Sequence, residues 1–215
     1  MSAGTSRREL RRQQHHELSR NQLLDAAEEV FGAKGFHDTT LKEVAELAEF
    51  SVGSVYSFFE NKDDLFLQVF LRRGDELLPE MEAVAATDAP PLDQLRALVD
   101  LEVGFFRQHR HFARLYLRSS PSTSLPPMPV YEGFKANFDR AMKLQADVFR
   151  RGQALGELRE GDPYVLARML SGIVATFQLL DPVTGSDDAQ PGGGMPLDDL
   201  HDLVAGAFAR PGGAA

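Results

Sequence analysis

The chain has 215 residues, is 43% hydrophobic, contains no cysteine and carries a formal net charge of −9. The absence of cysteine excludes disulfide scaffolds, thiolate zinc sites and cysteine nucleophiles. The longest apolar runs are only a few residues, and the basic N-terminal residues lack the apolar segment of a secretory signal. We therefore expect a soluble cytoplasmic protein with no membrane-spanning segment.

Charge is unevenly distributed along the chain. Residues 1–62 hold 8 Lys and Arg against 10 Asp and Glu, and the remainder holds 15 against 22. This balance argues against a protein that coats nucleic acid non-specifically. Only the beginning of the chain is clearly basic, and we expect residues 1–19 to form a flexible basic arm. The arm contains Arg7, Arg8, Arg11 and Arg12, and Arg20 follows directly after it.

The first helix is expected from Asn21, because apolar residues recur at helical spacing up to Phe31. Gly35 suits the left-handed position after a last helical turn, and Phe36 can fold back on Phe31. The sequence therefore predicts a helix that ends at Lys34.

Two short helices and the start of a fourth follow. Thr40 and Glu43 form a capping box, Ser51 is a second N-cap, and Asn61 caps the next helix. Two short helices joined by a three-residue turn form a helix-turn-helix, which we place at 20–62. Such a unit can project its second helix into the major groove of DNA. The candidate DNA-binding residues are Thr40, Ser51, Val52, Gly53, Ser54, Tyr56, Ser57, Phe58 and Lys62, with Tyr56 and Lys62 placed to reach phosphates.

The stretch TTLKEVAELAEFSVGSVYSFFENKDDLF resembles the head of the TetR family of transcriptional regulators. The match is carried by Thr40, Val44, Ala45, Ala48, Ser51, Gly53, Val55, Tyr56, Phe59, Asn61, Lys62 and Leu65. Three positions depart from the family pattern. Glu49 replaces a turn glycine, Phe58 replaces Tyr or His, and Val52 replaces a common Lys or Arg. These departures leave few polar groups for base reading, so we expect thymine methyls and DNA shape to contribute to specificity.

The remainder of the chain, 63–215, keeps a helical period throughout. We expect the fourth helix to end near Leu78, because Pro79 breaks it. Residues 80–91 are then expected to be a linker between this helix and the helical bundle that follows. The expected helices after this link are 92–106, 111–118, 130–155, 163–180 and 197–208, with irregular loops at 119–129 and 181–195. The fold class is therefore all-α with about nine helices.

The resemblance implies a ligand-sensing and dimerisation domain in 63–215. Carried over to this sequence, the family's dimer interface falls on 163–180 and 197–208, and its effector pocket lies between the preceding helices. The candidate ligand-binding residues are Phe105, Phe106, Phe112, Tyr116, Phe134, Phe138, Met142, Gln145 and Phe177. The implied partners are an operator duplex, a second copy of the chain and a small hydrophobic or aromatic effector that releases the repressor from its operator. No cofactor is expected.

Other interpretations remain open from the sequence. Phe and Met at helical spacing are typical of a core as well as of a pocket, Tyr56 can be a core aromatic, and Lys62 can be a solvated charge. The sequence contains no P-loop, GxGxxG, HExxH or GxSxG motif, and its histidines lack metal-ligand spacing, so neither an enzyme nor a metal site is expected. The alternative function is a protein-interaction or activator variant of the same fold with weakened DNA reading.

Overall fold

The computed structural model describes residues 6–119, 132–185 and 194–211. Within these residues the chain forms nine α-helices and no β-strand, with one isolated antiparallel bridge between Leu158 and Ala209. The chain divides into two compact units, Met1–Val69 and Phe70–Ala215, and each is described by itself. The sequence placed the corresponding boundary at 62/63.

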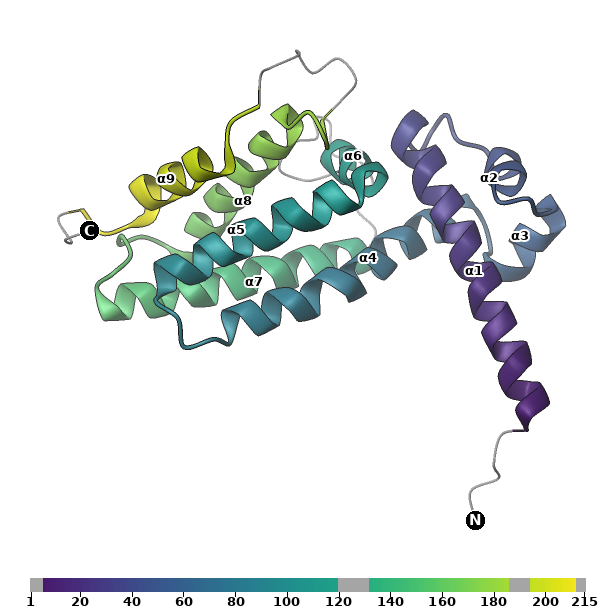
Figure 1. Ribbon diagram of the computed structural model, residues 1–215, viewed down its shortest axis with the longest axis horizontal. Coiled ribbons are helices and arrows are strands. Elements are labelled where there is room, and N and C mark those ends of the chain that lie inside the picture. Colours follow the sequence, from purple (N-terminus) through teal and green to yellow (C-terminus); the bar gives the residue numbers. More distant parts are fainter. Residues whose placement is uncertain (1–5, 120–131, 186–193, 212–215) are drawn as a thin grey trace. The chain divides into compact units, whose positions relative to one another are not determined.

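The first unit contains α1 (Arg7–Lys34), α2 (Leu41–Leu47), α3 (Val52–Phe58) and the beginning of α4 (Lys62–Ala85) (Figure 1). α2 packs on both α1 and α3. The core is built from residues at helical spacing that are almost fully buried: Leu23, Leu24, Ala27, Phe31, Val44, Ala45, Val55, Phe59 and Leu65. The predicted contact of Phe36 with Phe31 is present, with ring centroids 6.2 Å apart.

The N-terminal residues differ from the expected flexible arm. Residues 7–19 belong to α1, which begins at Arg7, nearly four helical turns before Asn21. The physical reason is a capping box: the Ser6 hydroxyl accepts from the Arg8 amide, and the Ser6 amide donates to Glu9 at 2.7 Å. The first buried residue of α1 is Ser19, so the preceding turns form an exposed helix. Residues 1–5 of the expected arm lie outside the described residues.

The two turns of the helix-turn-helix have the expected backbone geometry. Gly35 has φ 82° and its amide donates to the Phe31 carbonyl at 2.7 Å. Glu49 has φ 60°, in the left-handed region where a side chain costs about 1 kcal/mol. Ser51 and Asn61 accept from the amides of Ser54 and Asp64, so both are N-caps as predicted.

The second unit contains the rest of α4 with α5 (Pro91–Gln108), α6 (Arg110–Ser119), α7 (Glu132–Leu155), α8 (Pro163–Leu180) and α9 (Leu197–Phe208). α7 packs against α5 and α8, and α9 packs against α5 and α8 (Figure 1). Its largest fully buried side chains are Met81, Leu95, Leu98, Leu115, Phe149, Leu158 and Phe208. The expected bounds of α8 and α9 are confirmed at both ends.

α4 does not end at Pro79, contrary to the sequence expectation. It continues to Ala85, and residues 80–85 of the expected link are therefore helical. A proline inside a helix removes one hydrogen bond and costs about 3 kcal/mol. Leu78 and Met81 on either side of Pro79 are only 4% and 1% exposed, and their burial offsets that cost. The end of the helix is held by Arg151, which donates to the Ala85 carbonyl at 2.8 Å and to Gln94 at 2.9 Å.

α8 is the one described helix that is long and apolar enough to cross a membrane by composition, with a mean hydropathy of 1.3. One side of this helix packs in the core of the second unit through Leu166, Leu170 and Val174. Its C-terminal end is held by Asp181, which is 3% exposed and accepts from Arg107 at 2.7 Å. Packing in the core therefore explains the apolar residues on one side of α8.

Gly152 of α7 allows a close approach that a side chain would prevent. A Cβ there would lie 2.4 Å from Leu158 side-chain carbons and 2.9 Å from Pro91. We expect Gly152→Ala to lower the free energy of unfolding by about 1–3 kcal/mol through overpacking. Gly104→Ala is the matched control, because a Cβ there meets nothing within 4 Å. Its better helix propensity should raise stability by about 0.5–1 kcal/mol. Urea unfolding checks both, and a neutral Gly152→Ala would contradict the packing argument.

Candidate functional site

α3 presents one side to solvent and buries the other. Val55 and Phe59 are 0% and 2% exposed and anchor the helix in the first unit. Tyr56 is 58% exposed and Val52 is 37% exposed. Among the candidates named from sequence, Thr40, Ser51, Val52, Gly53, Tyr56 and Ser57 are exposed, whereas Ser54, Phe58 and Lys62 are half-buried. The structure thus brings most of the candidates onto one accessible surface.

The hydroxyl groups of α3 are oriented by the helix itself. The Ser51 and Ser54 hydroxyls lie 2.8 Å apart, and the Ser57 hydroxyl donates to the Ser54 carbonyl at 2.6 Å. A serine whose hydrogen is used in this way still has lone pairs free to accept. Ser57 can therefore accept from the amino groups of cytosine or adenine in the major groove.

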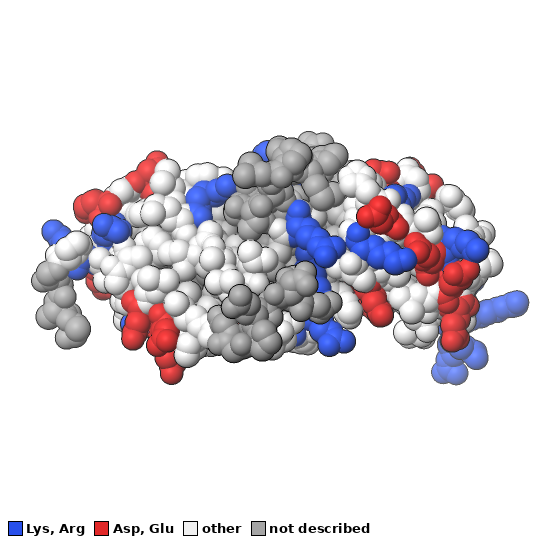
Figure 2. Space-filling model, turned by 90° about the horizontal axis from the view of Figure 1, so that it is seen from above, with Lys and Arg blue, Asp and Glu red and all other residues white. Residues whose placement is uncertain are grey.

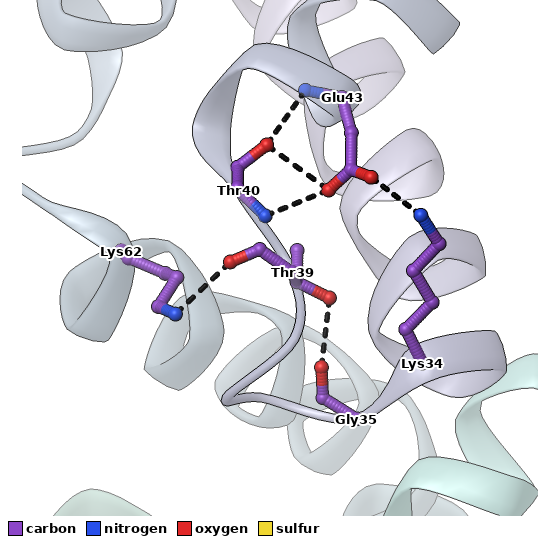
Figure 3. Close-up of polar contacts among 6 residues, drawn as sticks. All are labelled: Lys34, Gly35, Thr39, Thr40, Glu43 and Lys62. Carbon is purple, nitrogen blue, oxygen red and sulfur yellow. Dashed lines mark hydrogen bonds and ion pairs between the residues drawn. The ribbon is translucent and has the colours of Figure 1, made fainter.

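Lys62 has a different environment from the one expected. Its ammonium group donates to the carbonyl of Thr39 at 2.9 Å (Figure 3). It also donates to the carbonyls of Phe36 at 2.9 Å and His37 at 3.3 Å. It also lies 4.5 Å from the centre of the Phe36 ring. All three donor positions of the ammonium are therefore directed at the turn between α1 and α2. This geometry gives Lys62 a structural role within the first unit.

A second polar cluster fixes the beginning of α2. Thr40 and Glu43 form the predicted capping box, and Glu43 also pairs with Lys34 of α1 (Figure 3). The Lys34 ammonium and the Thr40 backbone and hydroxyl groups lower the pKa of Glu43 to about 2. The Thr39 hydroxyl donates to the Gly35 carbonyl at 2.7 Å. The α1–α2 turn is thus tied to both neighbouring helices.

The exposed N-terminal turns of α1 meet the end of α3. The His16 ring lies 4.6 Å from the Phe58 ring. Arg12 and Arg8 precede His16 by four and eight residues and therefore lie on the same helix face. No sequence signal pointed to the contact between His16 and Phe58, because it depends on the α1 extension being helical. Basic side chains accordingly continue the exposed surface of α3 along α1.

The second unit contains a cavity of about 70 Å³. Its walls come from α4, α5, α6, α7 and α8, and they are mainly aromatic and aliphatic. Seven of the candidates named from sequence line it: Phe106, Phe112, Tyr116, Phe134, Phe138, Met142 and Gln145. It is smaller than the roughly 150 Å³ cavity that admits benzene in an engineered protein. A ligand larger than a few atoms therefore requires the lining side chains to move.

Two candidates lie elsewhere. Phe105 is buried, with its ring 4.6 Å from the His109 ring, and Phe177 belongs to the core and lies 5.9 Å from Arg107. Sequence reasoning missed the wall that α4 supplies, because the family resemblance placed the pocket between the helices that follow α4. The residues missed on α4 are Phe70, Arg73, Gly74, Leu77, Leu78 and Met81.

Polar groups interrupt the apolar wall at a few points. Gln145, which is 1% exposed, donates from Nε2 to Glu102 Oε1 at 2.7 Å. The other Gln145 side-chain atom, Oε1, is buried without a hydrogen-bond partner, and so is Asn137 Nδ2. Burial raises the pKa of Glu102 to about 7, against the opposing effect of the Gln145 hydrogen bond. Sequence reasoning overlooked Glu102, although its signal was an acid within the apolar stripe of α5.

A largely uncharged surface covers α8 and α9. Figure 2 shows it as a broad white area with acidic and basic side chains at its margins. Val165, Met169, Leu180 and Leu203 are 53%, 54%, 56% and 47% exposed. A shallow groove between the two helices is lined by Ile173, Thr176, Phe177, Leu180, Gly194, Met195, Asp199, Leu200 and Leu203. An exposed apolar area of this kind on two helices is typical of a protein–protein interface.

Comparison with known proteins matches the head and the fold. A model of the bacterial regulatory proteins of the tetR family matches residues 23–69. The chain is 25% identical over 140 residues to the HTH-type transcriptional repressor KstR2 of Mycolicibacterium smegmatis, covering 65% of this chain and 67% of KstR2. It has the fold of FadR of Bacillus subtilis in complex with stearoyl-CoA, with TM-score 0.68, 19% identity and coverage of 86% and 94%. It also has the fold of AibR in complex with isovaleryl coenzyme A and operator DNA, with TM-score 0.69, 18% identity and coverage of 88% and 98%.

Proposed function

We propose that this chain, which belongs to the TetR family of bacterial transcriptional regulators, is a cytoplasmic repressor that leaves its operator when a small apolar ligand binds. Its helix-turn-helix makes it a DNA-binding regulator. The observation that carries the proposal is the pairing of two features in one chain. α3 presents Tyr56, Ser57 and Val52 to solvent, and the second unit encloses an aromatic cavity.

In this proposal α3 enters the major groove. Tyr56 donates to a phosphate, Ser57 accepts from a base, and Val52 contacts thymine methyls. Thr40, Ser51 and Gly53 approach the sugar–phosphate backbone, Ser54 lies beside the bases, and Phe58 supports α3 through His16. Lys62 acts by holding the α1–α2 turn. These assignments rest on exposure and hydrogen bonding within the first unit.

The proposed dimer forms through the apolar faces of α8 and α9, at Pro163–Leu180 and Leu197–Phe208. Four exposed apolar side chains and a mainly apolar groove, whose one charged lining residue among those described is Asp199, support this assignment. A twofold dimer presents two copies of α3, and the operator is then a pseudo-palindrome with half-sites about 34–36 Å apart.

The proposed effector is a small hydrophobic molecule held in the aromatic cavity. Two proteins with the same fold were solved with acyl-coenzyme A ligands, which supports a ligand-responsive second domain. The ligand must bind the form that does not fit DNA more tightly than the form that does, because equal affinity shifts nothing.

Substitutions on α3 test the DNA contacts separately. Tyr56→Phe should weaken binding to every duplex about tenfold, since a phosphate hydrogen bond contributes about 1.4 kcal/mol irrespective of sequence. Ser57→Ala should instead change the preference for a particular base pair. Tyr164→Phe is the matched control, an exposed tyrosine outside the first unit. Because it lies on α8, its oligomeric state is measured as well, and the dimeric variant should bind DNA like the wild type. Quantitative binding to a panel of duplexes decides, and an altered preference with unchanged affinity for Tyr56→Phe would refute its phosphate role.

A further inference from the structure

Glu102 is the feature of the cavity that a purely apolar ligand leaves unexplained. It occupies a position in the α5 stripe between Leu98 and Phe106, both of which are buried. A carboxyl group on a low-dielectric wall is costly unless it is paired or protonated. Within the described parts of the chain, its hydrogen-bond donor is the uncharged amide of Gln145, at 2.7 Å.

The charges around Glu102 can be followed helix by helix. Among the described residues lining the cavity, α4 contributes Arg73, α6 contributes Tyr116, and α7 and α8 contribute uncharged polar groups on Asn137, Gln145 and Ser171. Arg73 keeps its charge and forms an ion pair with Glu76 at 2.6 Å. The pKa of Glu102 is set by burial and by the Gln145 hydrogen bond, with no cation contributing.

The rest of the cavity wall can contact a cationic group of a ligand as well as its apolar part. Six aromatic residues line the cavity: Phe70, Phe106, Phe112, Tyr116, Phe134 and Phe138. Aromatic faces attract cations within about 6 Å, and the Phe138 ring already has the Arg168 guanidinium 5.0 Å from its centre. The unpartnered Gln145 Oε1 offers a further acceptor to an N–H donor beside Glu102.

We propose that the effector of this cavity is a small aromatic or aliphatic amine whose ammonium group pairs with Glu102 and Gln145 Oε1. The apolar part of the ligand lies among the aromatic side chains. A carboxylate ligand of the same shape should bind more weakly than the amine, because it would bring a second negative charge against Glu102 while the lining cation, Arg73, is already paired with Glu76. This inference rests on the proposed ligand-responsive function and names the chemistry of its ligand.

The test compares three probes that share one ring and differ in the head group: benzylamine, benzyl alcohol and benzoate. Binding to the full chain is measured by calorimetry or NMR titration without DNA. The wild-type protein should bind benzylamine at least tenfold more tightly than benzyl alcohol, and benzoate more weakly still. Glu102→Gln should remove the preference for the amine while leaving the alcohol within about twofold. Glu82→Gln is the matched control, since Glu82 pairs with Arg140 on the surface and does not line the cavity.

The pH dependence provides a second readout. Benzylamine stays protonated between pH 6 and pH 8, whereas Glu102, with its pKa raised to about 7, becomes ionised over that range. The affinity for the amine should therefore rise roughly tenfold from pH 6 to pH 8 and then level off. This rise should be absent in Glu102→Gln. His109, which lies 3.9 Å from Glu76, is present in both the wild type and Glu102→Gln. Any effect of His109 on the pH dependence of amine affinity is therefore the same in both proteins.

The outcomes separate this inference from the proposed function. Equal or tighter binding of benzoate, an amine preference that survives in Glu102→Gln, or no amine binding by folded protein would each overturn the inference. None of these results depends on DNA. Failure of the folded protein to bind any duplex would instead overturn the proposed function and leave the amine site intact.

Discussion

Replacement of Lys62 by alanine is expected to destabilise the first unit by about 2–4 kcal/mol. Hydrogen bonds to a charged group contribute about 1.5–3 kcal/mol each, and contributions from one shared ammonium are not additive. The Thr39 residue, whose carbonyl is one acceptor, is 1% exposed, so its carbonyl loses a partner that water does not readily replace. The expected result is faster amide exchange across 35–40 and a lower melting temperature of the head.

The same variant distinguishes a structural role from a phosphate contact. If Lys62 acts within the head, Lys62→Ala weakens DNA binding while the slope of log affinity against log salt stays unchanged. A lysine on a phosphate would reduce the magnitude of that slope by about one. Lys42→Ala is the control, because Lys42 has a side chain 75% exposed and pairs at 3.5 Å with Glu46 on its own helix. It should change stability by less than about 0.5 kcal/mol. A smaller slope with unchanged stability in Lys62→Ala would establish the phosphate contact instead.

Met169→Glu is expected to convert a dimer into a monomer and to weaken operator binding more than a hundredfold. Met169 is 54% exposed on the uncharged face of α8, and a glutamate on a twofold interface would bury two charges without partners. Loss of the dimer also removes the gain from linking two half-site contacts, which is typically 10²–10⁴-fold. Analytical ultracentrifugation measures the first effect and DNA titration measures the second.

Leu155→Glu is the control for that substitution. Leu155 is 66% exposed at the end of α7 and does not line the α8–α9 groove, so the same exchange of an apolar side chain for an acid should leave the dimer intact. Dimeric Met169→Glu would contradict the proposed interface. A monomeric Leu155→Glu would place the interface on another surface of the second unit.

Where the chain has strong local signals, the sequence predicted the structure closely. The caps at Thr40, Ser51 and Asn61 follow from side chains next to the backbone groups that they satisfy. The positive φ at Glu49 falls where the family pattern has a turn glycine. α8 and α9 were predicted to the residue. Proline at the first position of α8 and apolar periodicity in both helices are local features that need no tertiary information.

The N-terminal residues show how a local signal can be missed. Ser6 and Glu9 form a capping box that can be recognised in the sequence, but the helical turns that follow have no buried apolar side. We therefore expected a flexible arm, since a helix usually needs a buried face for its stability. In the structure that face begins at Ser19 and the helix extends outward from it.

Other features depend on tertiary contacts that no periodicity contains. Pro79 remains inside α4 because Leu78 and Met81 are held in the core of the second unit. Lys62 is directed at three carbonyls that become neighbours only when the α1–α2 turn closes. The side of α4 that lines the cavity is set by how the helices of the second unit pack together, and the carboxylate of Glu102 accepts a hydrogen bond from Gln145, 43 residues later in the chain.

The most direct test of the central claim is selection of duplexes from a random DNA pool by the purified full-length chain at two salt concentrations. The account predicts enrichment of an inverted repeat with half-sites about one helical turn apart, retained more weakly at the higher salt. It also predicts that benzylamine lowers that retention in wild-type protein and not in Glu102→Gln. Protein that is folded and dimeric but enriches no sequence at either salt concentration would contradict sequence-specific DNA binding by this head.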